Sequence, residues 1–112
     1  MKHVTFSEKS VLMDDEAADT LLEYARVIAE TSAADTVTLR AISHDGNTVE
    51  AAFLLNQNTI LIVESTNSEV EPPDNAEAVR EMRDRINAVT RTPTGQTAEP
   101  WPGADYDLTG GM

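Results

Sequence analysis

Apolar positions between Asp14 and Thr31 recur at steps of three and four residues, which places them on one face of a helix. That face consists of Ala18, Leu21, Leu22, Ala25, Ile28 and Ala29. Asp14 stands where a helix cap is expected, and more acids follow in or near the first turn, where the backbone dipole favours negative charge. The pattern predicts a helix over residues 14–31.

The next two apolar runs, TVTLRAI and TVEAAFLLN, alternate with a period of two and predict a β-hairpin. A two-residue turn at Asp45-Gly46 would divide the apolar side chains between both faces. A three-residue loop with Gly46 in the left-handed conformation shifts the register and sets Arg40 opposite Glu50. We expect this second register, because it gathers one apolar face from Val37, Leu39, Ala41, Val49, Ala51 and Phe53.

The run TILIVES predicts a third strand, and its four consecutive apolar residues indicate contact on both faces. Leu61 and Val63 are expected to join the core face. Ile60 and Ile62 then lie on the opposite face, beside three apolar residues of the hairpin, namely Ile42, Ala52 and Leu54. That face is more apolar than a solvated sheet surface, so either the second helix or another subunit is expected to cover it.

A second helix is expected after Pro72-Pro73, with Asp74 as its cap and Glu77 at capping-box spacing. Its apolar stripe is narrow and consists of Val79, Met82, Ile86 and Val89. Residues 3–6 and 11–13 are short candidates for further strands.

From Thr92 onward the chain contains no Lys or Arg and shows no hydrophobic period. The sequence therefore predicts one α+β domain over residues 1–91, with a three- to five-stranded antiparallel sheet and two helices. Residues 92–112 are predicted to form an acidic tail that is either disordered or folded back on the domain.

Composition narrows the cellular setting and the classes of partner. The 112 residues include no cysteine, which excludes disulfides and favours a reducing compartment. No apolar run approaches the roughly 20 residues that cross a bilayer, so a cytoplasmic protein is expected. Twenty acidic against eight basic side chains give a net charge of −12, which disfavours nucleic acids and anionic membranes as partners.

Residues that carry chemistry are few. His3 and His44 are the only histidines, so no metal site is expected, and no glycine-rich loop supports a nucleotide cofactor. Ser43, His44 and Asp45 are neighbours in the predicted turn and cannot align as a catalytic triad. A non-enzymatic protein is expected; a carboxylate enzyme, with Asp14, Asp15 and Glu50 converging, is the alternative.

The only tryptophan, Trp101, lies in the tail between two prolines, and Tyr106 follows it closely. Large aromatic side chains often dominate binding interfaces. We therefore expect a protein-binding or adaptor module, chaperone-like and homodimeric, that binds a protein partner or a second copy of itself. Its expected contact residues are Trp101, Tyr106, Ile60, Ile62, Leu54 and Ile42.

Two alternatives rest on other parts of the chain. An inhibitor or immunity-type protein would mask a basic site with an acidic face formed by Asp14, Asp15, Glu16, Asp19 and Glu23. The ending Gly110-Gly111-Met112 resembles that of ubiquitin-like modifiers before processing, although here a helix precedes the main hairpin, which departs from that fold.

Overall fold

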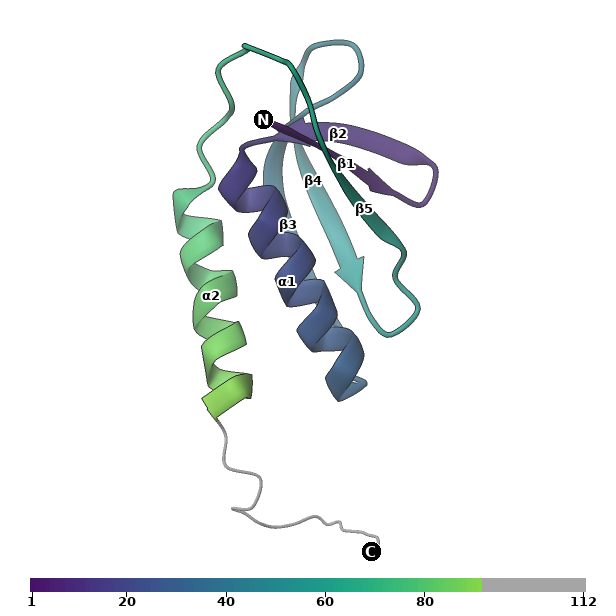
Figure 1. Cartoon of the computed structure of the whole chain (residues 1–112), viewed down its shortest axis with the longest axis vertical. Helices are drawn as coiled ribbons and strands as arrows, with labels where there is room; N and C mark the ends of the chain where they lie inside the picture. Colours follow the sequence, from purple (N-terminus) through teal and green to yellow (C-terminus); the bar gives the residue numbers. More distant parts are fainter. Residues whose placement is uncertain (92–112) are drawn as a thin grey trace, which may run out of the picture.

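The computed structural model describes residues 1–91, as five strands and two helices (Figure 1). In chain order these are β1 (Lys2–Phe6), β2 (Lys9–Met13), α1 (Asp15–Thr31), β3 (Asp35–Ile42), β4 (Thr48–Leu55), β5 (Leu61–Ser65) and α2 (Ala76–Arg91). The fold is α+β, as predicted. The predicted tail, with Trp101 and Tyr106, lies outside the described residues.

All pairings in the single sheet are antiparallel, and the strand order is β4-β3-β2-β1-β5. The two N-terminal strands are therefore central. Strand β5 does not extend the hairpin, beside which Ile60 and Ile62 were expected, but pairs with β1, with Val63 opposite Val4. The short segment of residues 56–60 consequently links the two edge strands of the sheet.

The predicted register of the β3–β4 hairpin is confirmed. Arg40 lies opposite Glu50, and Gly46 adopts a φ of 88° in the loop. The Ser43 N–H donates to the Asn47 carbonyl, and the Gly46 N–H donates to the Ser43 carbonyl, both at 2.9 Å. A positive φ is favourable for glycine because glycine has no Cβ, which explains why a glycine occupies this position in the loop.

The sheet is strongly curled, and its two halves meet at one point. Strands β2 and β3 share a single register pair, Leu12 with Ile42, and beyond it they separate (Figure 1). The curl brings β1 toward β4 across the interior, where the rings of Phe6 and Phe53 pack edge to face with centroids 5.5 Å apart. The concave face is thus closed around the core.

Helix α1 packs into this concave face. Its predicted cap is confirmed, since the Asp14 carboxylate accepts from the Ala17 N–H at 3.1 Å. Residues Ala18, Leu21, Ala25 and Ile28 of the predicted apolar face are buried, but Leu22 and Ala29 are exposed. The helix therefore leaves an apolar edge uncovered.

Helix α2 packs against α1 and covers less of the core (Figure 1). It begins two residues after Asp74, whose carboxylate accepts from the Ala76 N–H at 2.9 Å. Within its predicted stripe, Val79 and Met82 are buried, whereas Val89 is 40% exposed. Burial is therefore concentrated in the first half of α2.

Candidate functional site

The described residues that were expected to contact a partner do not all remain accessible. Leu54, Ile60 and Ile62 are 55%, 74% and 50% exposed, but Ile42 is only 9% exposed. Ile42 sits where β2 and β3 meet, so Leu12 and Thr48 flank it on the two neighbouring strands. Ile42 is therefore a structural residue at the junction of the two half-sheets.

The other three expected contact residues, Leu54, Ile60 and Ile62, lie at or next to the turn between β4 and β5. Several hydrogen bonds hold this turn. The Thr59 hydroxyl accepts from the Asn56 N–H at 2.8 Å and donates to the Leu54 carbonyl at 3.2 Å. The Thr59 N–H also donates to the Asn56 carbonyl at 3.1 Å. These bonds hold the backbone so that Ile60, directly after the turn, remains in solvent.

A fourth apolar residue, Leu22 of α1, lies close to the same turn. Leu22 is 42% exposed and lines a groove together with Thr59 and Leu61, the two chain neighbours of Ile60. We call Leu54, Ile60 and Ile62 the apolar patch. Leu22 does not belong to it, because Leu61, which lines the groove with Leu22, and Ile62 point to opposite sides of β5. Sequence periodicity placed Leu22 on the buried face of α1, and only the path of β5 leaves it at the rim.

The groove beside Leu22, here the α1–β5 groove, has a volume of about 450 Å³. It is lined by Asp19, Leu22, Glu23, Ala25, Arg26, Ala29, Thr59 and Leu61. Small and apolar residues of α1 form one wall and the start of β5 forms the other. Carboxylates at the rim can accept hydrogen bonds, so the groove suits an apolar group that carries a polar atom.

All five carboxylates of the predicted acidic face already have partners within the chain. Asp14 accepts from Ala17 and from the Asn75 amide, and Asp15 lies 3.3 Å from the N-terminal ammonium group. The three remaining ion pairs are Glu16 with Arg83, Asp19 with Lys2, and Glu23 with Arg26. The face therefore presents internally paired charges.

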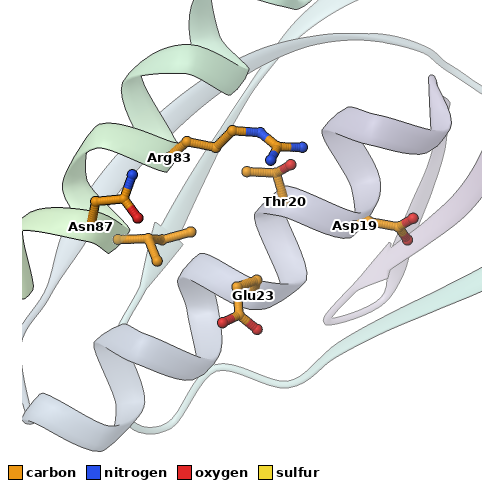
Figure 2. Close-up of a pocket in the computed structure, with 6 residues that line it drawn as sticks. Asp19, Thr20, Glu23, Arg83 and Asn87 are labelled. Carbon is orange, nitrogen blue, oxygen red and sulfur yellow. The ribbon is translucent and has the colours of Figure 1, made fainter. Parts of the chain in front are cut away.

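A second groove, of about 290 Å³, lies between α1 and α2 (Figure 2). Arg83 reaches from α2 over Thr20, while the carboxylates of Asp19 and Glu23 point away from the guanidinium (Figure 2). Each of these charged groups is paired elsewhere, as described above. The charged groups of this groove are therefore held in ion pairs, and Asp19 and Glu23 do not converge on one point as a pair of catalytic carboxylates would.

A three-residue cluster joins α1, β3 and α2 at Asp35. One carboxylate oxygen of Asp35 accepts from the Tyr24 hydroxyl at 2.5 Å and from the Arg85 guanidinium at 2.6 Å, and the other accepts from the Thr36 N–H. Partial burial acts to raise the pKa of Asp35, but the hydrogen bonds from Tyr24 and Thr36, together with the charge of Arg85, outweigh it and lower that pKa. Burial, followed by the Asp35 contact, raises the pKa of Tyr24. Because Tyr24 is 4% exposed, we assign the cluster a structural role.

Replacing Asp35 by Asn is expected to lower the free energy of unfolding by about 1–2 kcal/mol at pH 7, since two hydrogen bonds lose their charged acceptor. The folded-state pKa of Asp35 lies below its unfolded value. Its contribution is therefore complete above the unfolded pKa of about 4 and disappears as the pH falls through the folded value. Urea unfolding across this range should show the variant and the wild type converging in acid.

The matched control is Asp84→Asn, an exposed residue beside Arg85 on α2. We expect it to change stability by less than about 0.5 kcal/mol at either pH. An Asp35→Asn deficit that stayed constant down to pH 3 would contradict the assigned role of the carboxylate.

The remaining candidates for chemistry have structural contacts in the described part of the chain. Ser43 donates to Asp45 inside the hairpin loop, and Glu50 lies opposite Arg40 on the open face of the sheet. Over residues 1–91, no group of three or more His, Asp or Glu side chains is placed to hold a metal ion. Neither described helix is long and apolar enough to cross a membrane.

Comparison with known proteins gives no match to any family model, curated protein or solved structure. The geometry of the apolar patch and the α1–β5 groove is therefore the basis for the argument about function.

Proposed function

We propose that this chain is a non-enzymatic protein-binding module of the cytoplasm, an adaptor or chaperone-like protein, which binds a protein partner or a second copy of itself through the apolar patch. Trp101 and Tyr106 are proposed as further contact residues. The observation that carries the proposal is that Leu54, Ile60 and Ile62, at or next to one hydrogen-bonded turn, are 55%, 74% and 50% exposed.

The physical argument is that large apolar side chains in solvent gain free energy when a partner covers them. Full burial of a Leu or Ile side chain is worth about 1.5–3 kcal/mol. A few such residues dominate most interfaces, and a preformed backbone reduces the entropy that binding costs. The bonded turn at Asn56–Thr59 provides that preformed backbone.

The strand order supports the same location. Both β4 and β5 are edge strands in the described sheet, and each has one side without a strand partner. Free edges offer backbone hydrogen-bonding groups to another chain. Because Leu54 belongs to β4 and Ile62 belongs to β5, a partner on the patch can combine apolar contacts with main-chain bonds to one of these edges.

The pairing of charges favours this proposal over the masking of a basic target. Each carboxylate from Asp14 to Glu23 would have to exchange an internal partner for an external one, so the net gain is small. Binding through the patch should therefore depend weakly on salt, whereas charge-guided masking should weaken steeply as salt is added.

The test is a double substitution on the patch, Ile60→Ser with Ile62→Thr, in the full chain. Immobilised wild type is expected to retain at least one protein from an extract of its own cells, or to self-associate in sedimentation equilibrium. The double variant should lose that binding by tenfold or more, since removing two contacts of about 1 kcal/mol each exceeds 1.4 kcal/mol.

The matched control is Val70→Ser, which alters a side chain that is 59% exposed and lies outside the patch, in the connection from β5 to α2. It should bind as the wild type does. Equal retention and equal molar mass for the wild type and the double variant would overturn the proposal.

A further inference from the structure

Most of β3 has a neighbouring strand on one side only. Its whole length pairs with β4, but β2 meets it at a single register pair. On the side toward β2, the N–H and the carbonyl of Arg40 bond to the Asn75 amide. Because the main-chain groups of a strand alternate between its two sides, those of Thr36 and Thr38 face the same side as those of Arg40. This stretch of β3 is therefore a further edge of the sheet.

The backbone of Thr38 is the open part of this edge. The Thr36 N–H bonds to the Asp35 carboxylate, and Asn75 occupies Arg40. For the N–H and the carbonyl of Thr38, by contrast, residues 1–91 supply no hydrogen-bond partner on this side. The Asn75 amide accepts from the N–H and donates to the carbonyl of one residue, as a residue of a paired strand does. An extended peptide can therefore continue this ladder from Arg40 to Thr38.

Two adjoining pockets provide the space for such a peptide. One, of about 270 Å³, lies between Thr38, Arg40 and the start of α2, and the other, of about 230 Å³, extends from Thr38 to Arg85. Both are lined by Thr38 and Ala78, so together they form one groove, here the β3–α2 groove. The ion pair of Arg85 with Asp35 joins α2 to β3 at one end of it.

Carboxylates outnumber guanidinium groups along the β3–α2 groove. The charged residues of its lining are Glu50, Asp74, Glu77 and Glu81, against Arg40 and Arg85. Arg85 is already paired with Asp35, whereas Glu77 and Glu81 form no ion pair within residues 1–91. This distinguishes the groove from the acidic face of α1, whose carboxylates have internal partners. A cation that enters the groove gains contacts without displacing an internal one.

We propose that the β3–α2 groove binds an extended, basic peptide segment of a partner protein. The segment adds a short strand to β3 at Thr38 and places Lys or Arg side chains against Glu77 and Glu81. Main-chain bonds then supply affinity, and the charges select the partner. The groove shares no residue with the apolar patch, so this second binding site does not depend on the proposed function. Its occupancy falls steeply as salt is added, in contrast to binding through the patch.

The probe is an acetylated and amidated hexapeptide of alternating Arg and Thr, titrated into the full chain at low salt. We expect saturable binding in calorimetry and slower hydrogen exchange of the Thr38 amide, because that N–H gains an acceptor. The double variant Glu77→Gln with Glu81→Gln should bind the peptide about fivefold or more weakly, since two charged contacts are lost. The matched control, Glu8→Gln with Glu69→Gln, removes the same charge at exposed positions outside the groove and should bind as the wild type does.

Strand addition is tested with two further hexapeptides, methylated on one or the other alternate set of backbone nitrogens. Each keeps its charge and loses half of its main-chain donors, and one of them should bind several-fold more weakly than the parent. The inference would be overturned by a parent peptide that does not saturate, by methylated peptides that both bind equally well, or by a Glu77→Gln, Glu81→Gln variant that binds as the control does. The patch variant Ile60→Ser with Ile62→Thr should bind the hexapeptide as the wild type does. Loss of binding in that variant would place the peptide on the patch and would also overturn the inference.

Discussion

Replacing Val4 by Asp is expected to leave the protein unfolded at neutral pH. Val4 is fully buried in β1, where it lies opposite Val11 of β2 and Val63 of β5. The substitution loses about 1.5–3 kcal/mol of apolar burial and forces a carboxylate into the core, for a total of about 5 kcal/mol or more. A domain of this size has about 5–15 kcal/mol of stability in all.

The matched control is Thr5→Asp, which places the same charge one residue later on the opposite face of β1. Thr5 is half-buried, and its hydroxyl bonds that of Ser10 at 2.9 Å, so we expect a loss of about 1 kcal/mol. Circular dichroism and urea unfolding measure both variants. If Val4→Asp were as stable as Thr5→Asp, Val4 could not face the core from an interior strand as described.

The central position of β1 was the part of the fold that the sequence indicated least. The segment Lys2–Phe6 is five residues long, and β2 follows after a tight turn in which Ser7 has a φ of 59°. Such short strands carry little periodicity. Their partners, β3 and β5, lie far along the chain, and pairing of that kind depends on the assembled core.

Two predictions that depended on neighbouring residues were confirmed, whereas the cap of α2 is Asn75, whose carbonyl accepts from the Val79 N–H, and not Asp74. The cap at Asp14 and the Arg40–Glu50 register both follow from spacings of a few residues, because local bonds and a two-residue side-chain period determine them. The position of β5 was wrong for the complementary reason. A short link made hairpin pairing with β4 the simplest choice, whereas β1 had a free edge that only the complete sheet shows.

The candidate site was predictable in part. An excess of apolar residues on the second sheet face pointed to Leu54, Ile60 and Ile62, and these side chains are exposed in the structure. The same reasoning included Ile42, which β2 shields, and it missed Leu22. Exposure of a residue at the edge of a helical stripe depends on which strand lies next to it, and periodicity contains no information about that neighbour.

The side chain of Asn75 connects β3 to the starts of α1 and α2, and no pattern in the sequence indicated this role. It is 6% exposed and stands where β3 has separated from β2, so the backbone of Arg40 has a strand partner on the β4 side but none on the β2 side. The Asn75 side chain accepts from the Arg40 N–H at 2.7 Å and donates to the Arg40 carbonyl at 2.8 Å. It also donates to the Asp14 carboxylate at 3.1 Å, which links the start of α1 to the start of α2.

Replacing Asn75 by Ala is therefore expected to lower the free energy of unfolding by about 2–4 kcal/mol. The N–H and the carbonyl of Arg40 and one oxygen of the Asp14 carboxylate would each lose a hydrogen-bond partner. Asn75→Asp should be worse still at neutral pH, since a second carboxylate would face Asp14 and the Arg40 carbonyl, and its deficit should shrink in acid as the new group is protonated. Asn67→Ala, on an exposed residue of the β5–α2 connection, is the control and should stay within about 0.5 kcal/mol of the wild type. Urea unfolding of the three variants measures these differences. Equal midpoints for Asn75→Ala and Asn67→Ala would mean that water replaces the amide and that α1, β3 and α2 are held together by apolar packing alone.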